Sequence, residues 1–321
     1  MPATLAAASI AWSEDMSLVR AFARYGYVPV MLLGLNGLAI YLVQHGHSLW
    51  WTAPIGLTAF VLAFAMERVL PYEEEWNHAH DDVAKDVTHG LVYEFNNLTA
   101  LAILPIIAMF RPWEGIWPTH WPLALQVLTA IVVADCCMSV IHYWSHRIGW
   151  MWRLHAVHHG VNRLYGFNGL VRHPLHQTLD LTIGTLPLLI AGMTQEVAVL
   201  LALAISIQLV VQHSNVDYVL GPFRNWLAIG PVHRLHHVNW HGEGDVNFGL
   251  FFTVWDKLLG SFRMDSPTAP VAGDIGIQDR PHFPQVYKDQ LVLPFEPDHG
   301  AKRDKPRSQD EGDYGNLSPA E

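Results

Sequence analysis

Long apolar runs separated by short polar segments dominate the first two thirds of the chain. The clearest runs cover residues 27–43, 49–70 and 121–141, and each is close to the roughly 20 apolar residues that a helix needs to cross a bilayer. Residues 98–110 form a shorter run, which is long enough to span only if its helix extends back through residues 90–97. These runs predict membrane-spanning helices arranged as hairpins.

A further apolar stretch, residues 178–211, is too long for a single span. Thr194, Gln195 and Glu196 interrupt it near the middle, so we expect two helices joined by a turn. Pro187 lies in the first of these helices, where neighbouring groups in a membrane bundle can satisfy the carbonyl that it frees. The chain is therefore expected to be an all-α integral membrane protein built from three hairpins.

Composition supports this interpretation. The chain is 51% hydrophobic and only 15% charged, and its mean hydropathy of +0.18 is high for a soluble protein. A large soluble domain of buried helices is the alternative, and the length of the apolar runs disfavours it. Cys136 and Cys137 are adjacent within one run and are interpreted as small packing residues. The net charge is -10 and no basic footprint is present, so no nucleic-acid partner is expected.

Three histidine clusters follow the apolar runs. On an α-helix, residues three or four apart share a face, so we expect each cluster to aim its imidazoles in one direction. With 20 histidines in 321 residues, two HxxHH triplets together with an HxxxH pair are not expected by chance. The clusters are HYWSH with His142 and His146, HAVHH with His155, His158 and His159, and HRLHH with His233, His236 and His237.

Imidazole nitrogens bind zinc, copper, iron and nickel, so the ligand type does not name the metal. Eight histidines exceed the four ligands of a tetrahedral zinc site, whereas two metals with four or five nitrogens each would use them all. The sequence does not contain the carboxylate-rich ligand pattern of soluble diiron bundles, because its only ExxH matches start at Glu75 and Glu296 and lie outside the apolar helices. The clusters therefore predict a dinuclear site.

The distribution of basic residues predicts the orientation. If four segments cross before His142, the N-terminus and all three clusters lie on one side of the membrane. Ten arginines and lysines fall on that side, whereas the opposite loops hold Arg111. The positive-inside rule then makes the histidine-rich cap and both termini cytoplasmic, in a membrane that we expect to be the bacterial inner membrane. The first sixteen residues lack the features of a cleaved signal, so the first span is expected to remain as an anchor.

Taken together, the motifs resemble the fatty acid hydroxylase/sterol desaturase superfamily, in the order and spacing of bacterial sterol desaturase family proteins. The resemblance covers residues 67–262. It rests on HYWSHR, RLHAVHHG, RHP at 172–174, QHSN at 212–215, HRLHH, NFG at 247–249 and WDKLLGSF at 255–262.

This resemblance implies a membrane-embedded diiron oxygenase whose two iron ions are bound by histidine. By position, the family's ligands would be the eight histidines of the clusters together with His213. A tenth ligand is expected by analogy, and the sequence leaves it open between His241, four residues beyond His237, and His173. His89 and His176 are left out of the set. Carboxylates that accept from the other ring nitrogen are expected to orient the imidazoles, with Asp135, Asp180 and Asp245 as candidates.

The activity implied is hydroxylation of a lipid of the fatty acyl, sterol or carotenoid type, with dioxygen as co-substrate. Desaturation and alkylglycerol ether cleavage within the same superfamily remain open. A non-catalytic metal-binding or metal-transporting membrane protein is a distant alternative, which would need ionisable residues along the spans. The chain carries no haem-binding segment, so the resemblance implies a separate electron donor of the ferredoxin or b-type cytochrome kind. The lipid would enter from the bilayer.

We expect one membrane-embedded domain, residues 1–265, with its motif core at 67–262. Residues 266–321 lose the apolar periodicity and are expected to form a C-terminal extension. After about residue 297 the sequence is polar and charged, and it is predicted to be disordered.

Overall fold

The computed structural model describes residues 17–109, 115–240, 243–264, 269–278, 280 and 282–296. Within these residues the chain is helical, and its β pairing is limited to isolated bridges such as the one between Pro71 and Val216. The all-α fold class predicted from the apolar runs is confirmed.

Four helices in the described residues are long and apolar enough to cross a membrane, which identifies the chain as an integral membrane protein. The first, Leu18–Gln44, joins α1 (Leu18–Ala21), α2 (Tyr27–Pro29) and α3 (Asn36–Gln44) through π-helical turns. The others are Leu49–Val69, which contains α4 (Thr52–Val69), then α6 (Leu123–Ser145) and α9 (Gln195–His213). They correspond to the runs at 27–43, 49–70 and 121–141 and to the second arm of 178–211.

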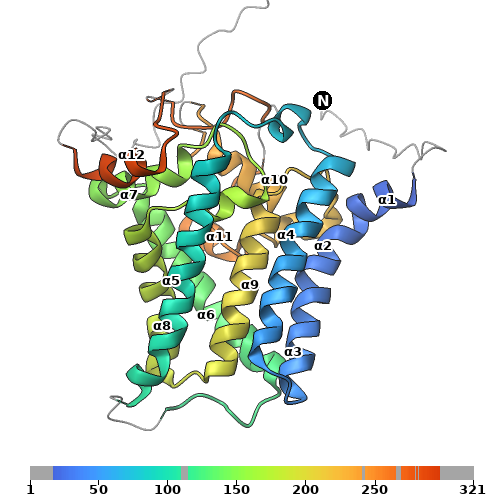
Figure 1. Ribbon diagram of the computed structural model, residues 1–321, viewed down its shortest axis with the longest axis vertical. Helices are drawn as coiled ribbons and strands as arrows, with labels where there is room; N and C mark the ends of the chain where they lie inside the picture. Colours follow the sequence, from blue (N-terminus) through green and yellow to red (C-terminus); the bar gives the residue numbers. More distant parts are fainter. Residues whose placement is uncertain are drawn as a thin grey trace, which may run out of the picture.

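Two further long helices, α5 (Val83–Met109) and α8 (Pro174–Ala191), run beside these four (Figure 1). α5 extends back to Val83, so it includes the residues on which a span at 98–110 depended. Neither helix is among the four candidate spans of the described chain, and their crossing of the membrane stays a prediction.

The break within the stretch 178–211 lies where polar residues interrupt it. α8 ends at Ala191, and Gly192 adopts a left-handed conformation with φ 91°, which costs glycine little. The Thr194 side chain then accepts from the Val197 N–H and caps α9, whose first turn contains Glu196. Two helices joined by a short turn are therefore observed, as predicted.

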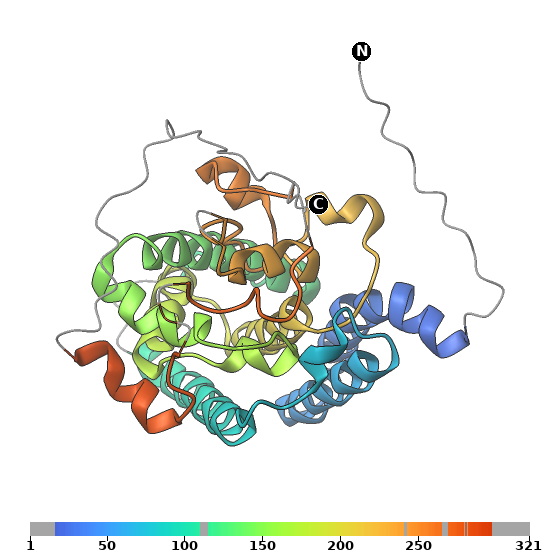
Figure 2. The same ribbon diagram turned by 90° about the horizontal axis from the view of Figure 1, so that it is seen from above.

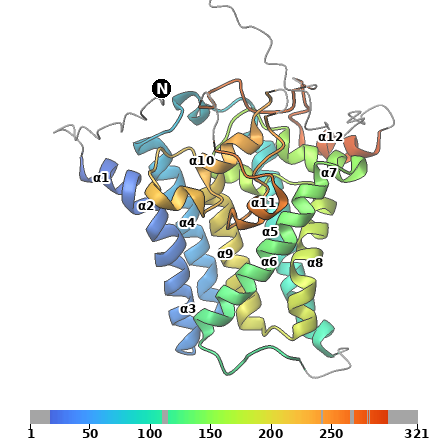
Figure 3. The same ribbon diagram turned by 180° about the vertical axis from the view of Figure 1, so that it is seen from behind.

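α9 lies at the centre of the bundle (Figures 1 and 3). In its most apolar segment of 18 residues, 78% of the residues are buried. Glycines let neighbouring elements approach each other closely. A Cβ added at Gly184 of α8 would lie 2.6 Å from Met138 Cε of α6, and one at Gly169 would lie 2.6 Å from the Leu209 carbonyl oxygen of α9. Close packing at these points joins α8 to α6, and the helical turn Gly166–Leu170 to α9, beneath the histidine clusters.

Short helices form a cap over one end of the bundle (Figure 2). They are α7 (Gly149–His159), α10 (Gly230–His233), α11 (Val254–Leu259) and α12 (Tyr287–Val292). The described residues between 269 and 296 pack onto this cap. The Gly276 N–H donates to the His237 carbonyl at 3.3 Å, and the Gln285 side chain donates to the Gly160 carbonyl at 2.9 Å. The described part of the C-terminal extension thus covers the histidine clusters.

Candidate metal centre

Nine histidines converge where the cap meets the bundle, in two adjacent groups. Within each group the candidate ligand nitrogens lie within 4.8 Å of one another. The five-histidine group contains His142, His146, His155, His159 and His236, and the four-histidine group contains His158, His213, His233 and His237. The set brought together consists of the eight cluster histidines and His213.

Each HxxHH triplet contributes to both groups. His155 and His159 belong to the five-histidine group, whereas His158 belongs to the four-histidine group. In the last triplet His236 belongs to the five-histidine group, whereas His233 and His237 belong to the four-histidine group. The expectation that each triplet aims in one direction is therefore wrong. Adjacent helical residues point about 100° apart, so the i+3 and i+4 imidazoles lie on opposite sides of the first one. The two triplets thereby join the groups into one centre.

Backbone carbonyls fix the tautomer of four of the nine rings. The Nδ1–H groups of His142, His158, His213 and His236 donate to the carbonyls of Phe248, Val171, Leu209 and Val246 at 2.9, 3.0, 2.9 and 2.8 Å. Because a carbonyl only accepts, Nδ1 must carry the proton, and Nε2 of the neutral ring is left with a lone pair.

These lone pairs face each other. The Nε2 atoms of His158 and His213 lie 3.3 Å apart, and Nε2 of His142 and of His236 is buried with no hydrogen-bond partner. Nε2 atoms of His213 and His233 are 3.1 Å apart, and those of His233 and His237 are 3.0 Å apart. Ligand nitrogens about 2.1 Å from a metal would be separated by about 3.0–3.4 Å. The donor set therefore fits metal ions.

The electrostatic environment keeps the rings in the form that binds metals. Burial, reinforced by neighbouring imidazoles, lowers the pKa well below 6.5 for every triplet histidine. These rings are neutral at neutral pH, and a neutral imidazole has a lone pair to offer.

One loop, residues 245–252, orients three histidines of the five-histidine group. The Asp245 carboxylate accepts a hydrogen bond from His146 Nδ1 at 2.9 Å. The carbonyls of Val246 and Phe248 accept hydrogen bonds from Nδ1 of His236 and of His142, respectively. Asp245, one of the three carboxylates considered from the sequence, thus contacts a ring of the group directly.

Asp135 does not contact an imidazole in this way, so that expectation is corrected. Its carboxylate accepts from the backbone N–H groups of Leu250, Phe251 and Phe252 at 3.0, 2.8 and 3.0 Å, and from Trp255 Nε1 at 2.7 Å. Three successive amides of the turning loop point at the carboxylate and occupy its oxygens. Asp135 therefore holds the loop that orients the histidines.

Asp256 holds the middle of the same loop and was missed from the sequence. Its carboxylate accepts from the backbone N–H groups of Phe248 and Gly249 at 2.6 and 2.8 Å. Its position within WDKLLGSF was the one signal available, because it lacks the spacing of a metal ligand.

Asp180 contacts His176, which was left out of the ligands expected from the sequence. Its Oδ2 lies 3.1 Å from His176 Nδ1 and 2.6 Å from Arg172 Nη1. The His176 ring lies against His155, with centroids 4.6 Å apart, and its Nε2 hydrogen-bonds to Ser145 Oγ at 2.9 Å. His176 therefore supports the five-histidine group from outside. The i,i+4 spacing of His176 and Asp180 was the available signal.

Among the residues that the structure describes, neither group contains a tenth histidine. His173 caps α8: its Nδ1 accepts from the Leu175 N–H at 3.2 Å, and its Nε2 donates to the Leu291 carbonyl at 3.1 Å. Both ring nitrogens are thus used on the backbone, and no lone pair remains for a metal. His241 lies outside the described residues.

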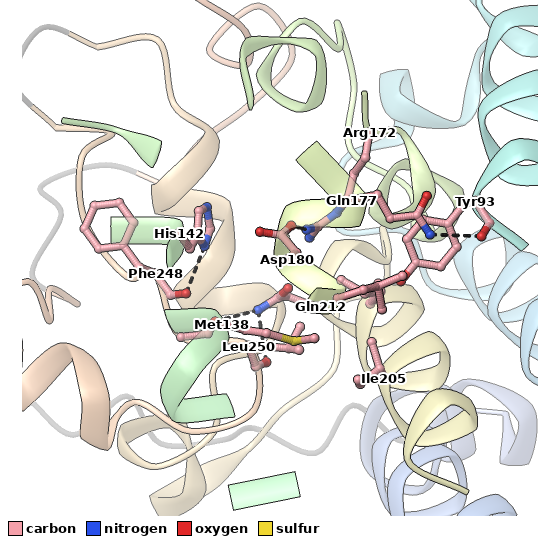
Figure 4. Close-up of a pocket in the computed structure, with 13 residues that line it drawn as sticks. Tyr93, Met138, His142, Arg172, Gln177, Asp180, Ile205, Gln212, Phe248 and Leu250 are labelled. Atoms are coloured by element: carbon pink, nitrogen blue, oxygen red, sulfur yellow. Dashed lines mark hydrogen bonds and ion pairs between the residues drawn. The ribbon is translucent and has the colours of Figure 1, made fainter. Parts of the chain in front are cut away.

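A pocket lies beside the five-histidine group, with an empty volume of about 500 Å³ that includes space open to solvent, and His142 is the histidine in its lining (Figure 4). Its walls come from α5, α6, α8, α9 and the 245–252 loop. A buried histidine centre bordered by such a cavity can hold a small molecule next to metals.

Comparison with known proteins agrees with this geometry. Residues 127–261 match the family model described as fatty acid hydroxylase. The ornithine lipid hydroxylase OlsE of Rhizobium tropici is 28% identical over 83% of this chain and 82% of its own length. Sphinganine C4-monooxygenase 2 of Arabidopsis thaliana is 29% identical over 52% of this chain and 64% of its own. Alkylglycerol monooxygenase of Danio rerio is 25% identical over 48% of this chain and 32% of its own. No solved structure matches.

Proposed function

Because the chain belongs to the fatty acid hydroxylase/sterol desaturase superfamily, we propose that it is a diiron oxygenase that hydroxylates a membrane lipid. The observation that carries the proposal is the convergence of nine neutral imidazoles, from sequence-distant segments, into two adjacent groups beside a cavity. Hydroxylation is favoured over desaturation, since the relatives named above are hydroxylases and monooxygenases. An acyl lipid with a polar head is the proposed substrate, by similarity to the ornithine lipid hydroxylase.

The five- and four-histidine groups would each hold one iron, and the pair would supply the activation of dioxygen for oxidation of a C–H bond. In the overall reaction a C–H bond is replaced by a C–OH bond. One oxygen atom of dioxygen enters the product, and the other is reduced to water, which consumes two electrons and two protons. A separate one-electron carrier of the ferredoxin or b-type cytochrome kind would provide the electrons.

The chain's own residues prepare this chemistry. Asp245 and the loop carbonyls fix the ring orientations, and burial of the triplet histidines keeps bulk water away from the centre. The proposed membrane is the bacterial inner membrane, with the cap and both termini in the cytoplasm. The ten basic residues predicted to lie on the cap side support this orientation.

The test compares the lipids of cells that express the wild-type protein with those of cells that express His236→Ala. We expect one lipid class to gain a single oxygen in the wild type only, and the purified wild type to contain close to two irons per chain. His120→Ala is the matched control, because His120 is exposed and distant in sequence from the clusters. A fully active preparation with one zinc or no metal would overturn the diiron proposal, and unchanged lipids would overturn lipid hydroxylation.

A further inference from the structure

The cavity beside His142 has a polar wall facing the histidine. Figure 4 shows His142 and Phe248 on one side, with the Arg172–Asp180 pair across from them. His142, Arg172 and Asp180 all line this one pocket. Any molecule in it therefore lies close to the five-histidine group and to the polar wall at the same time.

The polar wall is charged but neutral overall. Arg172 Nη1 lies 2.6 Å from Asp180 Oδ2, and the two side chains are only 15% and 10% exposed. Because the guanidinium charge is already balanced, a second anion placed here would lack a counter-charge and would be costly to bury. Arg172 Nε is nevertheless buried without a hydrogen-bond partner, so one donor remains. An uncharged acceptor suits this donor best.

A second, apolar hollow lies next to the first. It has an empty volume of about 460 Å³ between α5, α8 and α9, and residues such as Leu101, Leu104, Leu201 and Ala202 line it. Leu181 and Ile205 line both spaces. Along α9 the combined lining runs from Gln212 to Ala198, over which the helix rises about 21 Å. This length suits an extended hydrocarbon chain.

We propose that the two hollows form one bipartite substrate site. An uncharged hydrogen-bonding group, such as an amide carbonyl or a hydroxyl, lies against Arg172, and the attached hydrocarbon runs past Leu181 and Ile205 into the apolar hollow. Since the polar wall and His142 border the same small cavity, the oxidised carbon lies within a few bonds of that polar group. The inference rests on the proposed function and gives it a substrate class and a position of attack.

The binding arm of the test does not depend on activity. Thermal stabilisation of the purified holoprotein is measured with N-hexadecanoylethanolamine, a neutral amide, and with hexadecanoate, which has the same chain length and a carboxylate. We expect about tenfold tighter binding of the amide at neutral pH. Asp180→Asn leaves the Arg172 guanidinium without its counter-charge, so it should shift the preference toward hexadecanoate. Equal binding of the two probes to the wild type would contradict the polar wall.

The chain-length arm uses Ala202→Phe, which fills the apolar hollow away from the histidines. This variant should bind N-decanoylethanolamine as the wild type does and lose binding of the hexadecanoyl probe. Ala124→Phe adds the same bulk at an exposed position of α6 and should change neither. An Ala202→Phe variant with unchanged chain-length preference would contradict the apolar hollow as the binding site.

The product arm locates the new hydroxyl by tandem mass spectrometry, and we expect it within a few carbons of the polar group. A hydroxyl at mid-chain or at the methyl end would overturn the position of attack. If the binding preferences hold and no lipid is oxidised, the proposed function fails while the site remains. If lipid is oxidised without these preferences, the site fails while the function remains.

Discussion

The carboxylate of Asp135 accepts a 2.8 Å hydrogen bond from the backbone N–H of Phe251, 116 residues away in the sequence. The neighbouring amides of Leu250 and Phe252 donate to the same carboxylate. These bonds fix the loop whose Phe248 carbonyl orients His142. An acidic residue buried in a spanning helix therefore acts on the histidine centre through the backbone of a distant loop.

Asp135→Asn should loosen this loop while leaving the shape of the side chain unchanged. The amide NH₂ would face backbone donors in place of an acceptor, and lost bonds to a buried carboxylate cost about 1–3 kcal/mol each. We expect lower iron content and faster amide exchange at residues 248–252, measured by elemental analysis and hydrogen-exchange mass spectrometry. Asp217→Asn is the control, because its ion pair with Arg24 is partly exposed and contributes little. Normal iron content in Asp135→Asn would contradict the role of the loop.

Asp245→Ala should weaken metal binding through His146. Loss of a carboxylate that orients a liganding imidazole lowers metal affinity about 10–100-fold in other metal sites. Asp245→Asn keeps an oxygen that can accept from His146 Nδ1, so it should retain much of the affinity. Competition with a chelator checks the order wild type, Asn, Ala. Identical affinity in the two variants would show that the acceptor oxygen is not what matters.

His158→Ala should remove metal from the four-histidine group and spare most of the five-histidine group, because the triplet divides between them. We expect the metal content to fall from about two to about one per chain, with loss of lipid oxidation and normal membrane insertion. Elemental analysis of purified protein checks this. His159→Ala is the matched comparison and should affect the five-histidine group. Full retention of metal in both variants would contradict the assignment of ligands.

The metal-free protein should lose stability as the pH falls below about 6.5, the usual pKa of histidine in an unfolded chain. Burial lowers the folded-state pKa of the six triplet histidines well below that value. At pH 7.5 these rings are neutral in both states and make no difference. Below 6.5 the unfolded chain takes up protons that the folded chain refuses, so unfolding becomes easier. Thermal unfolding of metal-free protein between pH 7.5 and 5.5 checks this, and a constant unfolding temperature would refute it.

The apolar runs determined the spanning helices from local information alone. A run of about 20 apolar residues must satisfy its backbone internally in lipid, so the sequence leaves helix as the outcome. The turn at residues 192–194 was also local, because glycine and threonine end one helix and begin the next by their own conformational preferences. The eight cluster histidines were recognisable by their helical spacing, and His213 by the resemblance of its motif to that of a family.

Only the tertiary structure decided how those histidines divide and what orients them. Helical periodicity places His155, His158 and His159 near one another, but which group each joins depends on which histidines of α6, α9 and α10 the fold brings beside it. The partners of the rings are mostly backbone carbonyls, which every residue carries and no sequence pattern marks. For the same reason Asp135 was recognised as a buried acid and not as the anchor of a loop. Spacing along a helix is a local property, whereas the approach of a loop to a ring 106 residues away exists only once the chain has folded.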